Sequence, residues 1–118
     1  MDDTFSLTTE LYEGLPVIGV RGELDEWTSP ALEDAIHSYP DAGLVLVDLS
    51  NIRFISSAGI NALLRERAIL LALVCPPGNV MRLFQIVRAS NRAAIYESLS
   101  EAVQAAGTRA AQPLAVFG

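Results

Sequence analysis

Two adjacent serines, Ser56 and Ser57, are the side chains whose surroundings in this sequence best suit a chemical role. They follow an apolar run and precede an Ala-Gly pair, after which apolar residues recur at helical spacing. A hydroxyl at such a strand-to-helix junction can accept a hydrogen bond from the first free N–H groups of the helix. A phosphate is also tolerated there, because the amino terminus of a helix offers N–H donors and a partial positive charge. The pair therefore allows a structural cap, a regulatory phosphosite, or both.

The serine turn also matches the later part of the G-x-S-x-G pattern that carries the nucleophile of α/β-hydrolases. Residues 55–59, however, lack the first glycine of that pattern. The only histidine, His37, comes before the serines, whereas the hydrolase order places it last. A chain of 118 residues is also too short for that fold. We therefore expect no hydrolase.

Signatures of other catalysts are missing. The sequence has no lysine, which excludes a P-loop, and no G-x-G-x-x-G, C-x-x-C or H-E-x-x-H. Cys75 and His37 are each the only residue of their type and cannot assemble an ordinary structural zinc site. Glu23, Asp25 and Glu26 form an acidic group whose spacing is far from that of an EF-hand loop. We expect a protein that is not an enzyme and that uses no cofactor and no metal.

The composition is that of one globular domain. Hydrophobic residues make up 51% and charged residues 19%, which suits a buried core rather than wholesale disorder. The longest apolar run, residues 68–74, is too short to span a membrane. The acidic start of the chain differs from the basic start of a signal peptide, and the lone cysteine forms no internal disulfide. We expect a cytoplasmic protein.

Charge is distributed unevenly along the chain. Residues 1–50 hold eleven of the 14 acidic residues and a single arginine, whereas the other seven arginines follow residue 50. The net charge of −6 and the scattered arginines argue against a nucleic-acid partner. A basic or dipolar protein partner fits this distribution better, although an ordinary solvated surface is the simpler alternative.

Apolar patterning predicts a hairpin followed by alternating helices and strands. We expect strands at residues 5–11, 15–20, 44–49, 70–74 and 94–96, the last as a short edge strand. Helices are expected at 30–38, after residue 59, from residue 79, and from 98 or 100 to 106. Residues 22–25 should turn, and residues 107–118 should be a loose tail. The prediction is one α/β domain over residues 1–118, a mixed sheet of about five strands with about four helices.

Individual residues should begin these helices. Ser29 should cap the first helix with Pro30 in its first position, and Asn79 should cap the third. Trp27 should act as a hydrophobic staple or a partial core residue before the first helix, with an interface contact as the alternative.

Other side chains should form the core. Leu46 and Leu63 should link the central strand to the helix after the serines, because one lies in a continuous apolar run and the other on a helical stripe. The third helix should have one apolar face, which Val80, Leu83, Phe84 and Val87 share.

Three of these segments together resemble a known family, the STAS domains of bacterial anti-sigma-factor antagonists. They are Gly22-Glu23-Leu24-Asp25 before a Thr-initiated helix, the apolar strand ending in Asp48-Leu49-Ser50, and Phe54-Ile55-Ser56-Ser57-Ala58-Gly59 before a Leu-rich helix. The likeness is weaker but continuous through the end of the 70–74 strand and the following helix.

The resemblance implies a mixed sheet with helices mainly on one face, and a role in partner switching that controls transcription and stress responses. In that family the unphosphorylated antagonist binds an anti-sigma factor that is also a serine kinase, which frees the sigma factor. Phosphorylation of a serine at the start of the central helix ends binding, and a serine phosphatase restores it. That serine corresponds to Ser57, and the acidic residue of the family's G-E-L-D motif corresponds to Asp25. The implied partner-binding residues are Asp25, Ser56, Ser57, Ala58, Gly59 and Asn61.

The sequence departs from the family pattern in two places. Ser56 stands where the family usually has an aspartate, which removes a charge beside Ser57. The helix after Gly59 is also short, because Arg65 is followed almost directly by the next strand. A STAS subunit with a scaffolding or transport-accessory role, in which Ser57 is only a cap, is the alternative function.

Overall fold

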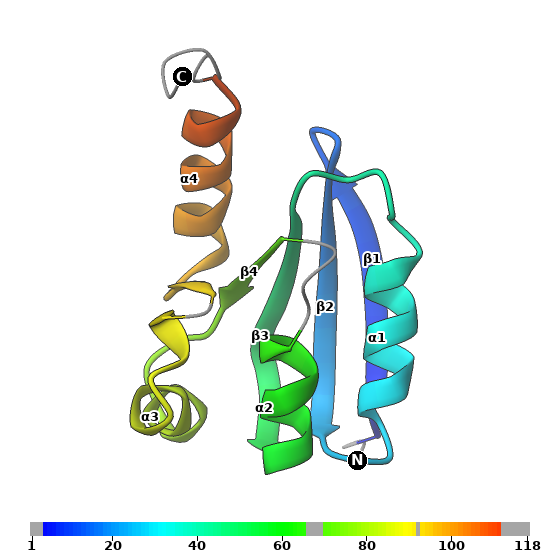
Figure 1. Cartoon of the computed structure of the whole chain (residues 1–118), viewed down its shortest axis with the longest axis vertical. Coiled ribbons are helices and arrows are strands. Elements are labelled where there is room, and N and C mark those ends of the chain that lie inside the picture. Colours follow the sequence, from blue (N-terminus) through cyan, green and yellow to red (C-terminus); the bar gives the residue numbers. More distant parts are fainter. Residues whose placement is uncertain (1–3, 66–69, 92, 112–118) are drawn as a thin grey trace.

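The computed structural model describes residues 4–65, 70–91 and 93–111 of the chain (Figure 1). The strands are β1 (Ser6–Tyr12), β2 (Leu15–Leu24), β3 (Val45–Ile55), β4 (Leu71–Val74) and β5 (Ala94–Tyr96). The helices are α1 (Ser29–His37), α2 (Ser57–Leu64), α3 (Asn79–Ile86) and α4 (Leu99–Ala111), with a 3₁₀ turn, η1 (Ala89–Asn91), before β5. The described residues confirm the predicted order of a hairpin followed by alternating helices and strands.

The five strands form one mixed sheet in the order β1-β2-β3-β4-β5. β1 and β2 are an antiparallel hairpin, joined by Glu13 and Gly14, whose positive φ angles of 53° and 85° suit a tight two-residue turn. β2 to β5 are parallel neighbours in chain order. Because such crossover connections share one hand, their helices fall on one face of the sheet. α1, α2 and α3 accordingly share a face, and α4, which follows the last strand, packs on the other.

The larger core lies between the sheet and the helices α1, α2 and α3. Alternate residues of the strands point into it, including Ile18 and Val20 of β2 and Val47 of β3. The helices contribute Leu32, Ile36, Ile60, Leu63, Leu64 and Phe84. α1 and α2 lie side by side in front of the sheet (Figure 1).

The smaller core lies under α4. It gathers Val17, Leu46, Ala72, Val74 and Ala102. Leu46 and Leu63 are both buried, as predicted, but the prediction that they link the central strand to α2 is wrong. The physical reason is strand alternation, which sends Leu46 to the face opposite its neighbours Val45 and Val47.

Two strands are longer than predicted. β2 continues through Gly22 and Glu23 to Leu24, so the predicted turn at 22–25 is wrong except at Asp25. β3 continues to Ile55 although its apolar run ends at residue 49. Each extension supports the other, because residues 21–24 pair with residues 51–55 in a parallel register that has one irregularity between Gly22 and Glu23. Pairing, rather than apolar composition, defines these strand ends.

The helix starts also differ from the predicted caps. α1 has Thr28 at its N-cap, and the Ser29 hydroxyl donates a hydrogen bond to the Asp25 carbonyl at 2.6 Å instead of capping the helix. Gly78, with φ of 149°, takes the N-cap position of α3, and Asn79 is the first helical residue. Residues 107–111 belong to α4, so that part of the predicted tail is helical, and residues 112–118 lie outside the described residues.

Candidate functional site at the carboxyl ends of β2 and β3

The serine turn and the loop after β2 meet at one edge of the sheet. Leu24 and Ile55, the last residues of β2 and β3, are paired neighbours. The Ser56 N–H donates to the Leu24 carbonyl at 2.9 Å and so ties the start of α2 to the end of β2. Because parallel strands end at the same edge, residues that are about 30 positions apart in the sequence become adjacent there.

The two serines have different positions at the start of α2. Ser56 is the N-cap of α2, with an extended backbone, and its hydroxyl oxygen accepts a hydrogen bond from the Gly59 N–H at 3.3 Å. Ser57 is the first residue of α2, and its side chain is exposed. Ala58 beside it is half-buried. The structural cap therefore belongs to Ser56, which leaves the Ser57 hydroxyl accessible at the helix amino terminus.

Gly59 allows α2 to approach β2. It is buried, and a Cβ atom added to it would lie 2.6 Å from the Leu24 carbonyl oxygen and 2.9 Å from Cγ1 of Ile55. Both distances are shorter than real Cβ contacts allow. The contribution of Gly59 to the site is thus a backbone approach that fixes the position of Ser57.

A shallow hollow beside Ser57 runs between α2 and the end of α3. It is lined by Ser57, Ile60, Asn61, Leu64 and Val87, and its volume is about 410 Å³. Asn61, one helical turn after Ser57, is exposed. We call this feature the α2–α3 hollow; it brings together two of the residues that the sequence predicts at the partner surface, Ser57 and Asn61.

The end of α3 presents apolar side chains to solvent. Leu83, Ile86 and Val87 are 37%, 69% and 48% exposed, whereas Phe84 is 1% exposed. The apolar face that Leu83, Phe84 and Val87 are predicted to share is therefore only partly buried. The sequence contains a signal for this exposure, because the apolar residues of α3 cover a wider arc of the helix than the stripe that one core can bury.

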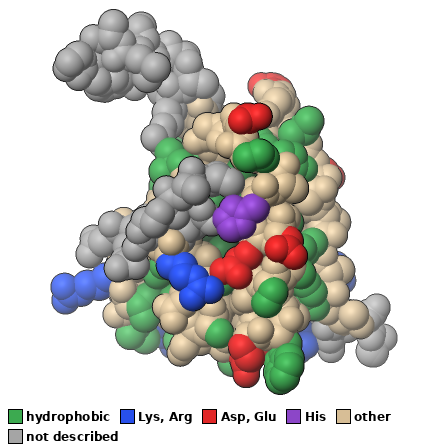
Figure 2. All heavy atoms as spheres, turned by 45° about the vertical axis from the view of Figure 1, so that its right-hand side comes forward, with side chains coloured by type: hydrophobic (Ala, Val, Ile, Leu, Met, Phe, Trp, Pro, Cys, Tyr) green, Lys and Arg blue, Asp and Glu red, His purple; other side chains and the backbone are tan. Residues whose placement is uncertain are grey.

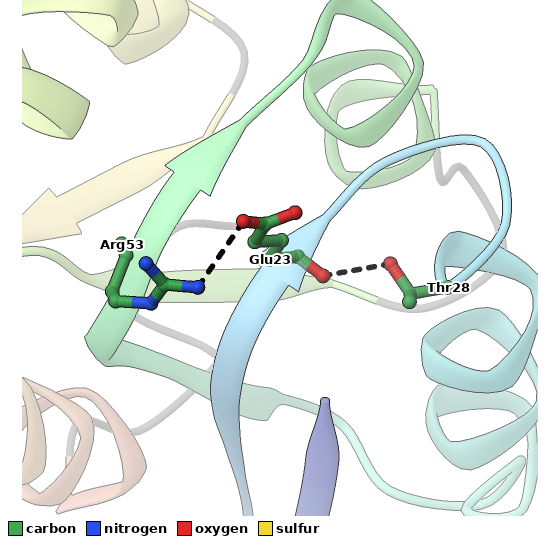
Figure 3. Close-up of polar contacts among 3 residues, drawn as sticks. All are labelled: Glu23, Thr28 and Arg53. Carbon is green, nitrogen blue, oxygen red and sulfur yellow. Dashed lines mark hydrogen bonds and ion pairs between the residues drawn. The ribbon is translucent and has the colours of Figure 1, made fainter. Parts of the chain in front are cut away.

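The loop between β2 and α1, residues 25–28, is ordered by Asp25. Oδ1 of Asp25 accepts hydrogen bonds from the Trp27 N–H at 2.9 Å and the Thr28 N–H at 3.0 Å. The Thr28 hydroxyl donates to the Glu23 carbonyl at 2.9 Å and accepts from the Asp25 N–H at 2.9 Å. Figure 3 shows how Thr28 reaches back to β2 in this way. One carboxylate oxygen of Asp25 thus holds the loop in place.

Trp27 lies on this loop and is 83% exposed. The prediction that it is a staple or a partial core residue is therefore wrong, whereas the alternative of an interface contact stays a prediction. The tight turn accounts for the difference, because the two Asp25 hydrogen bonds direct the chain at Trp27 away from the sheet.

Acidic groups surround this edge and are partly neutralised. Glu23 pairs with Arg53 at 3.1 Å (Figure 3), and Glu33 of α1 pairs with Arg65 at 3.0 Å. Both pairs are largely solvated, so each stabilises the fold only weakly. Figure 2 shows acidic side chains gathered on the face that α1 presents.

The other reactive side chains are away from the site. His37 is the last residue of α1 and Ser57 is the first of α2, so the length of α1 separates these two residues along the sheet and keeps them from acting as a nucleophile and its base. Cys75 is 1% exposed, and this burial raises the pKa of its thiol to about 11. Among the described residues no group of histidine, cysteine and acidic side chains could hold a metal ion. No helix in this part of the chain is long and apolar enough to cross a membrane.

Solved structures with the same fold include several anti-sigma factor antagonists. One from Mycobacterium paratuberculosis is 25% identical, with a TM-score of 0.79 over 89% of this chain and 96% of that one. The anti-sigma factor antagonist SpoIIAA in its unphosphorylated form is 18% identical, with a TM-score of 0.63 over 89% of this chain and 98% of its own. A putative antagonist from Thermotoga maritima is 16% identical, with a TM-score of 0.68 over 83% and 92% of the two chains.

The sequence matches a protein family but no individual curated protein. None of the curated proteins matches the sequence. The STAS domain family, in contrast, matches residues 6–102, which run from the start of β1 into α4 and include both serines and the Asp25 loop. The chain therefore belongs to the STAS domain family.

Proposed function

We propose that this STAS domain is an anti-sigma-factor antagonist that binds an anti-sigma factor with serine-kinase activity and is released when that kinase phosphorylates Ser57. A serine phosphatase would then restore the binding form. The observation that carries the proposal is the division of labour in the serine pair: Ser56 caps α2, and Ser57 is exposed beside the α2–α3 hollow. The domain acts by binding and carries out no catalysis of its own.

The likeness to known antagonists supports this function. The neighbour from Mycobacterium paratuberculosis is an anti-sigma factor antagonist that shares a quarter of its residues with this chain. SpoIIAA exists both in an unphosphorylated and in a phosphorylated form, so this fold is compatible with a phosphate.

A phosphate on Ser57 should leave the fold intact. It adds about −1.5 to −2 charges, and the amino terminus of α2 offers backbone N–H groups and a favourable dipole. Ser56 supplies the cap without the carboxylate that the family pattern has at this position, so a phosphate on Ser57 meets less repulsion from its neighbour. The cost of phosphorylation therefore arises at the partner surface, where burying an uncompensated charge costs several kcal/mol.

The test combines phosphate mapping with binding. The purified anti-sigma factor kinase of the same organism is incubated with ATP and the wild-type, Ser57→Ala or Ser56→Ala protein, and the modified residue is located by mass spectrometry. We expect the label on Ser57, none in Ser57→Ala, and retained labelling at a changed rate in Ser56→Ala. Ser57→Ala should bind the kinase as tightly as wild type, whereas stoichiometrically phosphorylated protein should bind at least tenfold more weakly.

Ser57→Glu separates folding from binding. Its melting temperature should stay near that of wild type while its affinity falls, because the charge lies at an exposed helix terminus in the free protein. Labelling of Ser56 or of another residue contradicts the proposal, and so does phosphorylated protein that binds as tightly as wild type. Binding to a membrane transport complex with no labelling would instead support the accessory role.

A further inference from the structure

We infer that Trp27 is the anchor of the partner interface and that Asp25 serves it by positioning the Trp27 loop rather than by contacting the partner through its charge. The occupant is the proposed anti-sigma factor, which should offer an apolar pocket rimmed by basic side chains. The inference rests on the proposed function. It adds to that function the residue that contributes most of the binding free energy, a role that neither Ser57 nor the family pattern supplies.

Trp27 does not contribute to either hydrophobic core of the free domain. A tryptophan side chain carries one of the largest apolar surfaces in proteins, and 83% of the residue faces solvent. It is the only tryptophan in the chain, and residues 25–28 place it on an ordered loop rather than on a frayed terminus. Tryptophan on a rigid support is the residue most often found at the centre of protein interfaces, because little conformational freedom is lost on binding.

Trp27 lies at the same edge of the sheet as Ser57. The loop begins one residue after Leu24, whose carbonyl accepts a hydrogen bond from Ser56 N–H and limits the position of Gly59. A partner that covers Ser57 at the start of α2 therefore meets the loop that carries Trp27. A single interface can bury both residues.

Asp25 accepts hydrogen bonds from residues of its own loop and from the start of α1. Its Oδ1 atom accepts from two backbone N–H groups, and its carbonyl accepts from both the N–H and the hydroxyl of Ser29. The bonds of Oδ1 need an acceptor oxygen and not a negative charge. An asparagine could make the same two bonds, whereas an alanine could make neither.

The charge around Trp27 selects the partner. Residues 22–35 contain five acidic side chains and neither lysine nor arginine. Glu23 and Glu33 are paired with arginines from other elements, whereas Glu26 beside Trp27 is an exposed acid. An apolar anchor in acidic surroundings is complementary to an apolar pocket with a basic rim.

The first experiment measures affinity for the purified anti-sigma factor kinase. Trp27→Ala should weaken binding about 30-fold or more, which is the loss that defines an interface hot spot. Tyr12→Ala is the matched control, because Tyr12 is an exposed aromatic residue at the opposite, hairpin end of the sheet. Tyr12→Ala should bind as wild type does, and both variants should keep their melting temperature. Trp27→Phe should recover part of the lost affinity.

The second experiment separates positioning from charge. Asp25→Asn should bind within about threefold of wild type and Asp25→Ala at least tenfold more weakly, because only asparagine retains the acceptor. Asp25→Asn binding as weakly as Asp25→Ala would overturn the positioning role and assign Asp25 to a charged contact. Glu26→Gln should reduce the salt dependence of the association rate.

A spectroscopic readout follows Trp27 itself. With 5-fluorotryptophan incorporated in this chain alone, one fluorine resonance reports one residue. The free protein should show the solvent isotope shift of an exposed indole, and binding should move the resonance and remove that shift. A resonance that does not respond to a saturating kinase, or a Trp27→Ala variant with unchanged affinity, overturns the inference and leaves the proposed function standing. Wild-type protein that does not bind the kinase overturns both.

Discussion

The two faces of the sheet differ in how far along the strands their apolar cores extend. On the face of α1, α2 and α3, β2 is apolar to its end, from Ile18 to Leu24. On the face of α4, the same strand has buried Val17 near its start, but Arg21 is exposed and Glu23, the last residue of β2 on this face, is only half-buried. The longer core, under α1, α2 and α3, continues below the serine turn and the Trp27 loop, whereas the shorter core, under α4, ends before it reaches them. The apolar support of the site therefore comes from one face of the sheet only.

This difference predicts that substitutions in the two cores have different effects on partner binding, even where they lower the free energy of unfolding by similar amounts. The α1–α3 face holds α2 and hence Ser57 in place. The α4 face stabilises the sheet without touching that edge. Each of the following changes tests one part of this contrast.

Replacing Leu63 and Leu46 in turn is the direct test. Each side chain is at most 2% exposed, so Leu→Ala at either position should lower the free energy of unfolding by roughly 2–5 kcal/mol. Only Leu63→Ala should also weaken binding to the kinase under conditions where both proteins remain folded, because Leu63 positions α2. Denaturant titrations give the stability and calorimetry gives the affinity. Equal affinity losses in the two variants would remove the functional distinction between the faces.

Gly59→Ala should disturb the site more than the fold. The added Cβ would lie 2.6 Å from the backbone oxygen of Leu24, so α2 must shift away from β2, at a cost of about 1–3 kcal/mol. Binding should fall together with stability, because the shift moves Ser57. Gly43→Ala is a control, since a Cβ atom there meets no atom within 4 Å. A Gly59→Ala protein with wild-type melting and binding would show that the close approach is unimportant.

The buried thiol of Cys75 should make the α1–α3 face sensitive to high pH. Its pKa is raised by burial from 9.0 to about 11, so only the unfolded state ionises between these values. Stability from this group is complete below pH 9.0 and should fall as the pH rises to about 11, by roughly 2 kcal/mol. Urea titrations across this range, with Cys75→Ala as the reference, isolate the effect. Parallel pH profiles for the two proteins would contradict it.

Substitutions in the serine pair should have the smallest effects on stability, and Ser56→Ala should cost more than Ser57→Ala. The Ser56→Ala change removes one capping hydrogen bond of 3.3 Å and should cost about 1 kcal/mol or less. Ser57→Ala, at the next position, should cost less still, because the cap does not depend on it. Thermal unfolding of the two variants measures the difference. A larger loss in Ser57→Ala would reverse the roles assigned to the two serines.

Much of the fold is readable from the sequence because it depends on local pattern. The run at 44–49, the hairpin around Gly14 and the helical spacing after Gly59 predict the element order, and the order of parallel strands fixes the face on which the first three helices lie. The serine turn could likewise be identified as a helix start. These features need only the chemistry of neighbouring residues.

Other features depend on contacts between distant segments. The sequence does not predict the ends of β2 and β3, because their pairing, and not their composition, extends them. It predicts one shared core for Leu46 and Leu63, because a continuous apolar run does not show which face each residue meets. At Trp27 the sequence predicts a staple or a partial core residue because the hydrophobicity of tryptophan is evident there, whereas the Asp25 hydrogen bonds that turn it outward are not.

The order of the elements, the helix start at the serine pair and the family resemblance can be predicted from the amino-acid sequence, since each depends on residues close together along the chain. Three features emerge only in the folded protein: which serine caps α2, which leucines share a core, and the exposure of Trp27 at the edge of the sheet where Ser57 lies. The reason is that burial and hydrogen bonding are properties of the assembled sheet, where parallel pairing brings the ends of β2 and β3 together.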